Sequence, residues 1–115
     1  MASVASAFPI LPGKTAAWKQ FTQELAGGRR QEFEASRRRL GTRTERAYLQ
    51  STPQGDMAVV YIEADDVAGV LQGMGSSQDP FDVWFREQVM DIHGLDLSQP
   101  MPGPLPEIYI DWQAR

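Results

Sequence analysis

The feature that most constrains the fold is the order in which strand-like and helix-like patterns follow one another along the chain. Short alternating or continuous apolar runs are typical of strands, and longer runs with apolar residues three or four positions apart are typical of helices. The runs are Val4–Leu11 (strand), Thr15–Leu40 (helix), Arg46–Ser51 (strand), Met57–Glu63 (strand), Asp66–Ile92 (helix) and Ile108–Trp112 (strand). This order predicts an α+β, ferredoxin-like fold, β-α-β-β-α-β, with a four-stranded antiparallel sheet and helices on one face.

Both helical regions contain residues that interrupt a helix. In the first region the pair Gly27-Gly28 predicts a kink or a break, because glycine is a poor helix former. In the second region Gly73 and Gly75 end a short helix. Asp79-Pro80 then starts another, with aspartate as the cap and proline at the first helical position.

Two strands carry apolar residues on both faces. Met57–Ile62 is apolar at successive positions, as is the first strand apart from Ser6, and this pattern is typical of strands buried on both sides. Arg46–Ser51 instead alternates, with Ala47 and Leu49 facing inward. Because the helices can cover only one face of such a sheet, another molecule must cover the second face. The simplest cover is a second copy, so we predict a homodimer packed through its sheet faces.

The composition is that of one soluble domain spanning residues 1–115, with 42% hydrophobic and 23% charged residues. The chain has no cysteine, which excludes thiol chemistry and suits the reducing cytoplasm, the location that we predict. The first residues lack the basic lead and long apolar run of a signal peptide. No stretch approaches the roughly 20 apolar residues that a membrane span needs, so we expect no membrane association.

The net charge of −4 is unevenly distributed. Residues 29–46 hold seven arginines against three glutamates, whereas residues 47–115 hold two arginines against eleven acids. An arginine-rich helix invites a nucleic-acid interpretation, but most of the surface would repel a duplex. We therefore predict no nucleic-acid partner, and we interpret Arg37, Arg38 and Arg39 as a solvated helix face with salt links within the chain or across a dimer.

Five short segments spread over most of the chain carry a resemblance to known proteins. They are Phe8–Lys14, Glu34–Gly41, Thr52–Asp56, Asp79–Phe85 and His93-Gly94. In these segments the chain resembles the dimeric α+β barrel superfamily, and more closely a family of small uncharacterised bacterial proteins within it. The resemblance implies two ferredoxin-like subunits that pair their sheets, and a pocket between the sheet and the helices of one subunit. The wider superfamily includes cofactor-independent antibiotic-biosynthesis-type monooxygenases and haem-degrading enzymes.

His93 is the single histidine and admits three interpretations. At the end of a helix it can donate to the last carbonyls and interact favourably with the helix dipole, which is the role we favour. It can also serve as a polar contact in a ligand pocket. The resemblance to haem enzymes adds iron ligation as the third. Neither a cysteine nor a second histidine accompanies it, so we expect no metal site and no cofactor.

The aromatic residues offer a candidate ligand site. Trp18 and Trp84 lie on the apolar stripes of the two main helices, where a core role is the simpler interpretation. The functional interpretation is an aromatic wall for a flat ligand, with His93 and Tyr61 as polar contacts. His93 follows Trp84 by nine residues, about half a turn away in angle, which weakens this grouping. Tyr48 faces outward and is expected at the dimer interface.

Two functions are compatible with these observations. The first, which we favour, is a dimer that binds a small apolar or aromatic molecule without catalysis. The alternative is a cofactor-independent monooxygenase of the antibiotic-biosynthesis type acting on an aromatic substrate, which would require a base to ionise the substrate. The acidic pairs Asp65-Asp66 and Asp79/Asp82 stand at helix starts, where capping explains them without catalysis.

Overall fold

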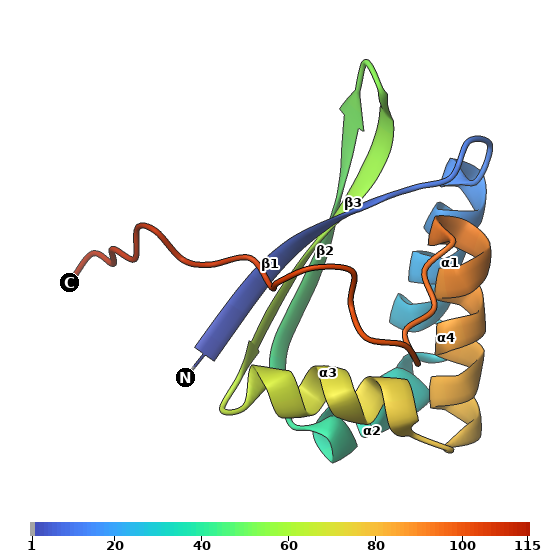
Figure 1. The fold of residues 1–115 in the computed structure, drawn as a ribbon. Helices are drawn as coiled ribbons and strands as arrows, with labels where there is room; N and C mark the ends of the chain where they lie inside the picture. The colour runs from blue at the N-terminus through green and yellow to red at the C-terminus, as the bar shows by residue number, and fades with distance from the viewer. Residues whose placement is uncertain (1) are drawn as a thin grey trace.

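The computed structural model describes residues 2–115. Over that range the chain forms strands β1 (Ala2–Pro9), β2 (Thr42–Thr52) and β3 (Gly55–Ala64), and helices α1 (Thr15–Ala26), α2 (Arg30–Leu40), α3 (Val67–Ser76) and α4 (Pro80–His93). The three strands make one open antiparallel sheet in the order β1-β3-β2, and the helices gather on one side of it (Figure 1). The α+β class is therefore confirmed.

The predicted interruptions of both helical regions are also confirmed. Helix α1 ends at Ala26 and α2 begins at Arg30, so the glycine pair separates two helices. Helix α3 ends at Ser76. Helix α4 begins after Asp79, whose side chain accepts a hydrogen bond from the backbone N–H of Phe81 at 2.9 Å.

The strand register determines which side chains face the helices. Val4, Phe8, Ala58 and Ile62 lie on this inner face, because β1 pairs Val4 with Ile62 and Phe8 with Ala58. The predicted inward orientation of Ala47 and Leu49 in β2 is confirmed, because Ala47 lines the interior and Leu49 packs on the core. The larger core cluster joins β3 and the residue that follows β1 to three helices. Its members are Ile10, Trp18, Phe21, Ala58, Met74, Phe81, Phe85, Val89 and Ile92.

The outer face of the sheet carries Tyr48, Val59 and Tyr61, which alternate with the inward residues. Among residues 2–115 no helix covers this face, as Figure 1 shows. Tyr48 remains 55% exposed. Tyr61 lies under the Arg46 guanidinium at 5.9 Å, and the neighbouring Glu63 carboxylate raises its pKa. The outer face thus combines an apolar centre with a polar end.

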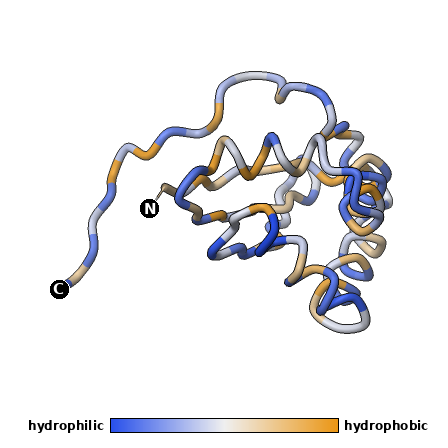
Figure 2. Tube along the Cα trace, turned by 90° about the horizontal axis from the view of Figure 1, so that it is seen from below, coloured by the Kyte–Doolittle hydropathy of each residue, from blue (hydrophilic) through white to orange (hydrophobic). Residues whose placement is uncertain are grey.

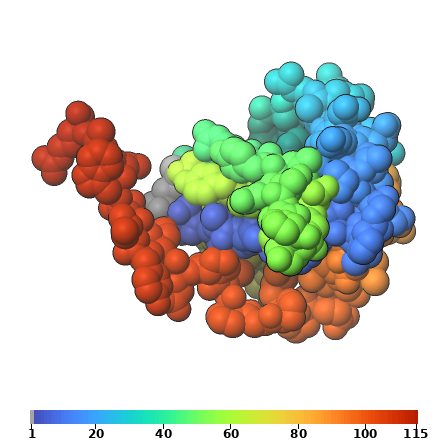
Figure 3. Space-filling model, turned by 90° about the horizontal axis from the view of Figure 1, so that it is seen from above, coloured from blue at the N-terminus to red at the C-terminus, as the bar shows by residue number. Residues whose placement is uncertain are grey.

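The C-terminal segment departs from the predicted four-stranded arrangement, which is not confirmed. Residues 108–112 pair with no strand within the described range, and Tyr109 and Trp112 are 89% and 79% exposed. The segment projects from the body as an arm (Figure 3), along which apolar and polar positions alternate (Figure 2). The four prolines at 100, 102, 104 and 106 lack N–H donors, so the chain leading to the arm cannot form a regular ladder with β1.

None of the helices in residues 2–115 is long and apolar enough to cross a membrane.

Candidate ligand-binding site

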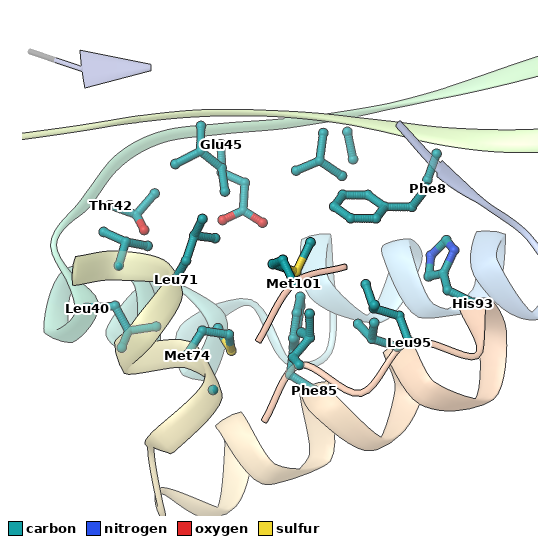
Figure 4. A pocket seen from close by; sticks show the side chains of 18 of the residues that line it. Phe8, Leu40, Thr42, Glu45, Leu71, Met74, Phe85, His93, Leu95 and Met101 are labelled. Carbon is teal, nitrogen blue, oxygen red and sulfur yellow. The ribbon is translucent and has the colours of Figure 1, made fainter. Parts of the chain in front are cut away.

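A cavity of about 490 Å³ lies between the inner face of the sheet and the helices. Residues from all three strands and from α1, α2, α3 and α4 line it, and the segment 95–101 closes one side with Leu95, Leu97 and Met101 (Figure 4). Its walls are mostly apolar, including Phe8, Trp18, Val60, Met74 and Phe85. A volume of this size can hold a small organic molecule.

The structure brings two of the four expected ligand-binding residues to this cavity. Trp18 from α1 and His93 from the end of α4 both line it. Trp84 does not line the cavity but packs behind its wall, in an aromatic cluster with Phe21 and Phe81 at centroid distances of 5.6 and 5.5 Å. This separation follows from the angular offset between positions 84 and 93 on one helix. Tyr61 is on the outer face of the sheet, as its register with Ala5 and Arg46 requires.

His93 is tied to β1 rather than to its own helix. Its Nδ1 lies 2.8 Å from the carbonyl oxygen of Pro9, the last residue of β1. Two residues later, Leu11 donates its backbone N–H to the Ile92 carbonyl at 2.9 Å. The expectation that His93 donates to the last carbonyls of its helix is therefore wrong. Because a carbonyl only accepts, Nδ1 carries the hydrogen and Nε2 is left with a lone pair in the neutral ring.

The electrostatics of His93 favour that neutral ring. Burial lowers the pKa of His93 below its ordinary value, and the Pro9 carbonyl only partly offsets this effect. The Phe8 ring lies 6.1 Å away, centroid to centroid, on one side of the imidazole. His93 is therefore a neutral group at one end of an apolar cavity.

A buried ion pair that sequence reasoning missed lies in the cavity wall. Arg37 donates from Nε and Nη2 to the two Glu45 carboxylate oxygens, at 2.8 and 3.2 Å. Its guanidinium carbon lies 4.7 Å from the centroid of the Phe33 ring and 4.4 Å from that of Phe85. Arg37 is only 9% exposed, so its assignment to a solvated helix face is wrong. The assignment holds for Arg38 and Arg39, which are exposed, and the expected salt links within the chain are present, from Arg37 to Glu45 and from Arg39 to Asp79 and Asp82.

A second buried cluster surrounds Asp82, and it too was not expected. The Ser36 hydroxyl donates to one carboxylate oxygen of Asp82, while Ser77 and Arg39 donate to the other at 2.6 and 2.8 Å. Burial alone would raise the pKa of Asp82, but these donors outweigh it and hold the pKa below its ordinary value. Asp82 does lie in the first turn of α4, as expected, but capping does not account for its side chain, which is fully buried and joins α2 to α4.

The sequence does hold signals for the Arg37–Glu45 pair. Arg37 falls between Phe33 and Leu40 on a helix, at spacings of four and three, so it shares their inward face. Glu45 precedes Ala47 and Leu49 at intervals of two, so the alternation of β2 continues inward to it. Arg37 and Glu45 have opposite charges, and each lies on the apolar face of its element. This combination indicates a buried ion pair between the helix and the strand.

Other charged groups are engaged within the chain. Arg29 pairs with Glu24 and Glu32, Arg30 with Glu34, and Arg43 with Asp65. Among residues 2–115 no three histidine, aspartate or glutamate side chains gather in a way that could hold a metal ion.

The fold and the cavity together define a small α+β protein with an apolar pocket between a three-stranded sheet and its helices. Comparisons with family models, with curated proteins and with solved structures found no match to this chain.

Proposed function

We propose that this protein binds a small apolar or aromatic molecule in the cavity between its sheet and its helices. The cavity itself carries the proposal: about 490 Å³ of space, apolar walls and a few convergent polar groups are the usual properties of a small-molecule site. Trp18 and Phe85 provide aromatic surface, and His93 provides a neutral hydrogen-bonding group at one end.

The three tryptophans make a direct test feasible. Trp18 lines the cavity, whereas Trp84 lies in the aromatic cluster and Trp112 in the exposed arm. The double variant Trp84→Phe/Trp112→Phe therefore leaves a fluorophore that reports on the cavity alone. We expect biphenyl to quench this fluorescence saturably. The matched variant Trp18→Phe, which keeps the other two tryptophans, should show no saturable quenching. No saturable response in either variant would contradict the proposal.

We also propose that the protein works as a homodimer packed through the outer sheet faces. The support is the uncovered centre of that face, with Val59 and Tyr48 side by side, and the arm at residues 108–112 that lacks a strand partner. A second subunit would cover the face and could offer the arm an edge on which to complete a four-stranded sheet. Light scattering should give about twice the 12.8 kDa chain mass, and Val59→Lys should halve it, while Gln50→Lys at the sheet end should not. A wild-type monomer would contradict the dimer.

One observation favours the monooxygenase alternative. His93 is neutral, and its Nε2 carries a free lone pair because Nδ1 binds the Pro9 carbonyl. Such a nitrogen can take the proton of a phenolic substrate, which is the base that cofactor-independent oxygenation requires. Oxygen uptake in the presence of electron-rich polycyclic phenols, abolished by His93→Asn, would support this alternative over simple binding.

A further inference from the structure

A β-bulge at the start of β2 turns two polar side chains into the same end of the cavity. Thr42 pairs with Ala64 and Glu45 with Ile62, and the register shifts between Thr42 and Thr44. In a regular strand, residues three apart point to opposite faces. The extra residue of the bulge brings both onto the inner face, and bulges near functional sites often re-aim side chains in this way. Figure 4 shows Thr42 and Glu45 at one end of the cavity and His93 at the other.

The hydroxyl of Thr42 has an unmet hydrogen-bonding requirement. Its Oγ1 is buried and has no hydrogen-bond partner among residues 2–115, the only such side-chain atom in that range. A buried hydroxyl without a partner costs free energy, so it is normally paired with protein, water or ligand. Thr42 also lines the cavity, so a rotation about its Cα–Cβ bond can present this hydroxyl to a molecule that occupies the cavity and supplies the missing partner.

The neighbouring Glu45 carboxylate sets the charge that such a molecule can carry. Each of its oxygens accepts one bond from Arg37, which leaves further acceptor capacity on both. Arg37 already commits three of its five N–H groups, two to Glu45 and one to the Ser36 hydroxyl at 3.1 Å, and two rings flank the guanidinium. The ion pair is neutral overall, so an anionic group would meet the Glu45 carboxylate with no net positive charge to offset it.

We propose that this end of the cavity recognises the neutral hydroxyl group of an otherwise apolar ligand, such as an alcohol or a phenol. A hydroxyl both donates and accepts, so one group can donate to Glu45 and accept from Thr42. The apolar body of the ligand then extends along the cavity towards Trp18 and His93. This inference rests on the proposed function, since it assigns a ligand class to the same cavity.

The test compares three probes with the same two-ring body in the Trp84→Phe/Trp112→Phe background: biphenyl, para-phenylphenol and para-phenylbenzoate. We expect para-phenylphenol to bind about tenfold more tightly than biphenyl, the advantage of one well-placed hydrogen bond. Thr42→Val preserves the shape of the side chain and should reduce that advantage, because the bond to Glu45 remains, without changing the affinity for biphenyl. Thr22→Val is the matched control, because Thr22 also lines the cavity but its hydroxyl already donates to the Lys19 carbonyl at 2.9 Å.

The possible outcomes separate the two claims. Equal binding of biphenyl and para-phenylphenol, or an advantage that Thr42→Val leaves undiminished, overturns the hydroxyl assignment and leaves the cavity as a ligand site. Tightest binding by para-phenylbenzoate also overturns it, because the Arg37–Glu45 pair would then open for an anion. If none of the three probes binds, the proposed function fails and the assignment fails with it.

Discussion

The two buried polar clusters are neighbours, yet they differ in how completely their hydrogen bonds are satisfied. In the Asp82 cluster both carboxylate oxygens accept bonds, from Ser36 on one side and from Ser77 and Arg39 on the other. At the cavity end, Thr42 has no partner among residues 2–115 and Glu45 retains acceptor capacity. Arg37 connects them, through Ser36 and Glu45. A closed network serves to join helices, whereas an open one beside a cavity is suited to a ligand.

The largest expected effect concerns the closed cluster. Asp82→Asn keeps the shape of the side chain but removes the charge that balances Arg39, and its amide group donates where an oxygen accepted. We expect the free energy of unfolding to fall by about 2–4 kcal/mol in urea denaturation. Asp91→Asn is the matched control, because Asp91 forms an exposed pair with Lys14 and should change stability by about 0.5 kcal/mol at most. Equal effects of the two variants would show that the cluster is not structural.

A smaller effect is expected from His93, which lies at the opposite end of the cavity from Thr42. Its folded-state pKa is lowered by burial, so the unfolded chain binds the proton more tightly. Stability from this group is therefore complete above the unfolded-state pKa near 6.5 and declines as the pH falls from there towards the lower folded-state pKa. Urea denaturation from pH 8 to pH 5 should show this decline.

Two further measurements isolate the contribution of His93. As the single histidine, it gives one imidazole titration by NMR, and we expect a midpoint below 6.5. His93→Asn retains a donor for the Pro9 carbonyl but does not titrate, so it should reduce the slope of stability against pH. A midpoint at or above 6.5 would mean that burial does not disfavour the charged ring, and any decline in stability between pH 8 and pH 5 would then come from other groups.

The fold was largely predictable because local signals agree with the packing. Gly27-Gly28 separates the first helical region into two helices, and Asp79-Pro80 starts the last helix, as the helix preferences of glycine and proline predict. The alternation of Ala47 and Leu49 identifies the inner face of β2. The arm at residues 108–112 was not predictable in the same way. Its alternating pattern is that of a strand, but the segment 101–106 that leads to it lies beside β1 and contains three prolines, which have no N–H to donate to a ladder.

The candidate site was predictable only in part. The periodicity of the apolar residues in the first helix identifies its inward face, and Trp18 lies on that face. The Asp82 cluster depends on Ser36 and Arg39, which reach Asp82 only when α2 packs on α4, and no local pattern encodes that contact. The inward turn of Thr42 depends on a bulge, which shifts strand parity without a distinctive residue in this sequence.

The smallest predicted changes in stability come from two variants that each remove one buried hydroxyl, one from each cluster. They give the most direct comparison of the two clusters. Ser36→Ala deletes a hydroxyl that donates to Asp82 and accepts from Arg37, so we expect a loss of about 1–2 kcal/mol in unfolding free energy. Thr42→Val deletes a hydroxyl without a partner among residues 2–115 and keeps the β-branched shape that strands favour. We therefore expect no loss, and a gain of up to about 1 kcal/mol. Urea denaturation of both variants without ligand measures the sign of each change. If Thr42→Val destabilises the protein as Ser36→Ala does, then Thr42 is satisfied in solution, and the cavity end is closed rather than open to a ligand hydroxyl.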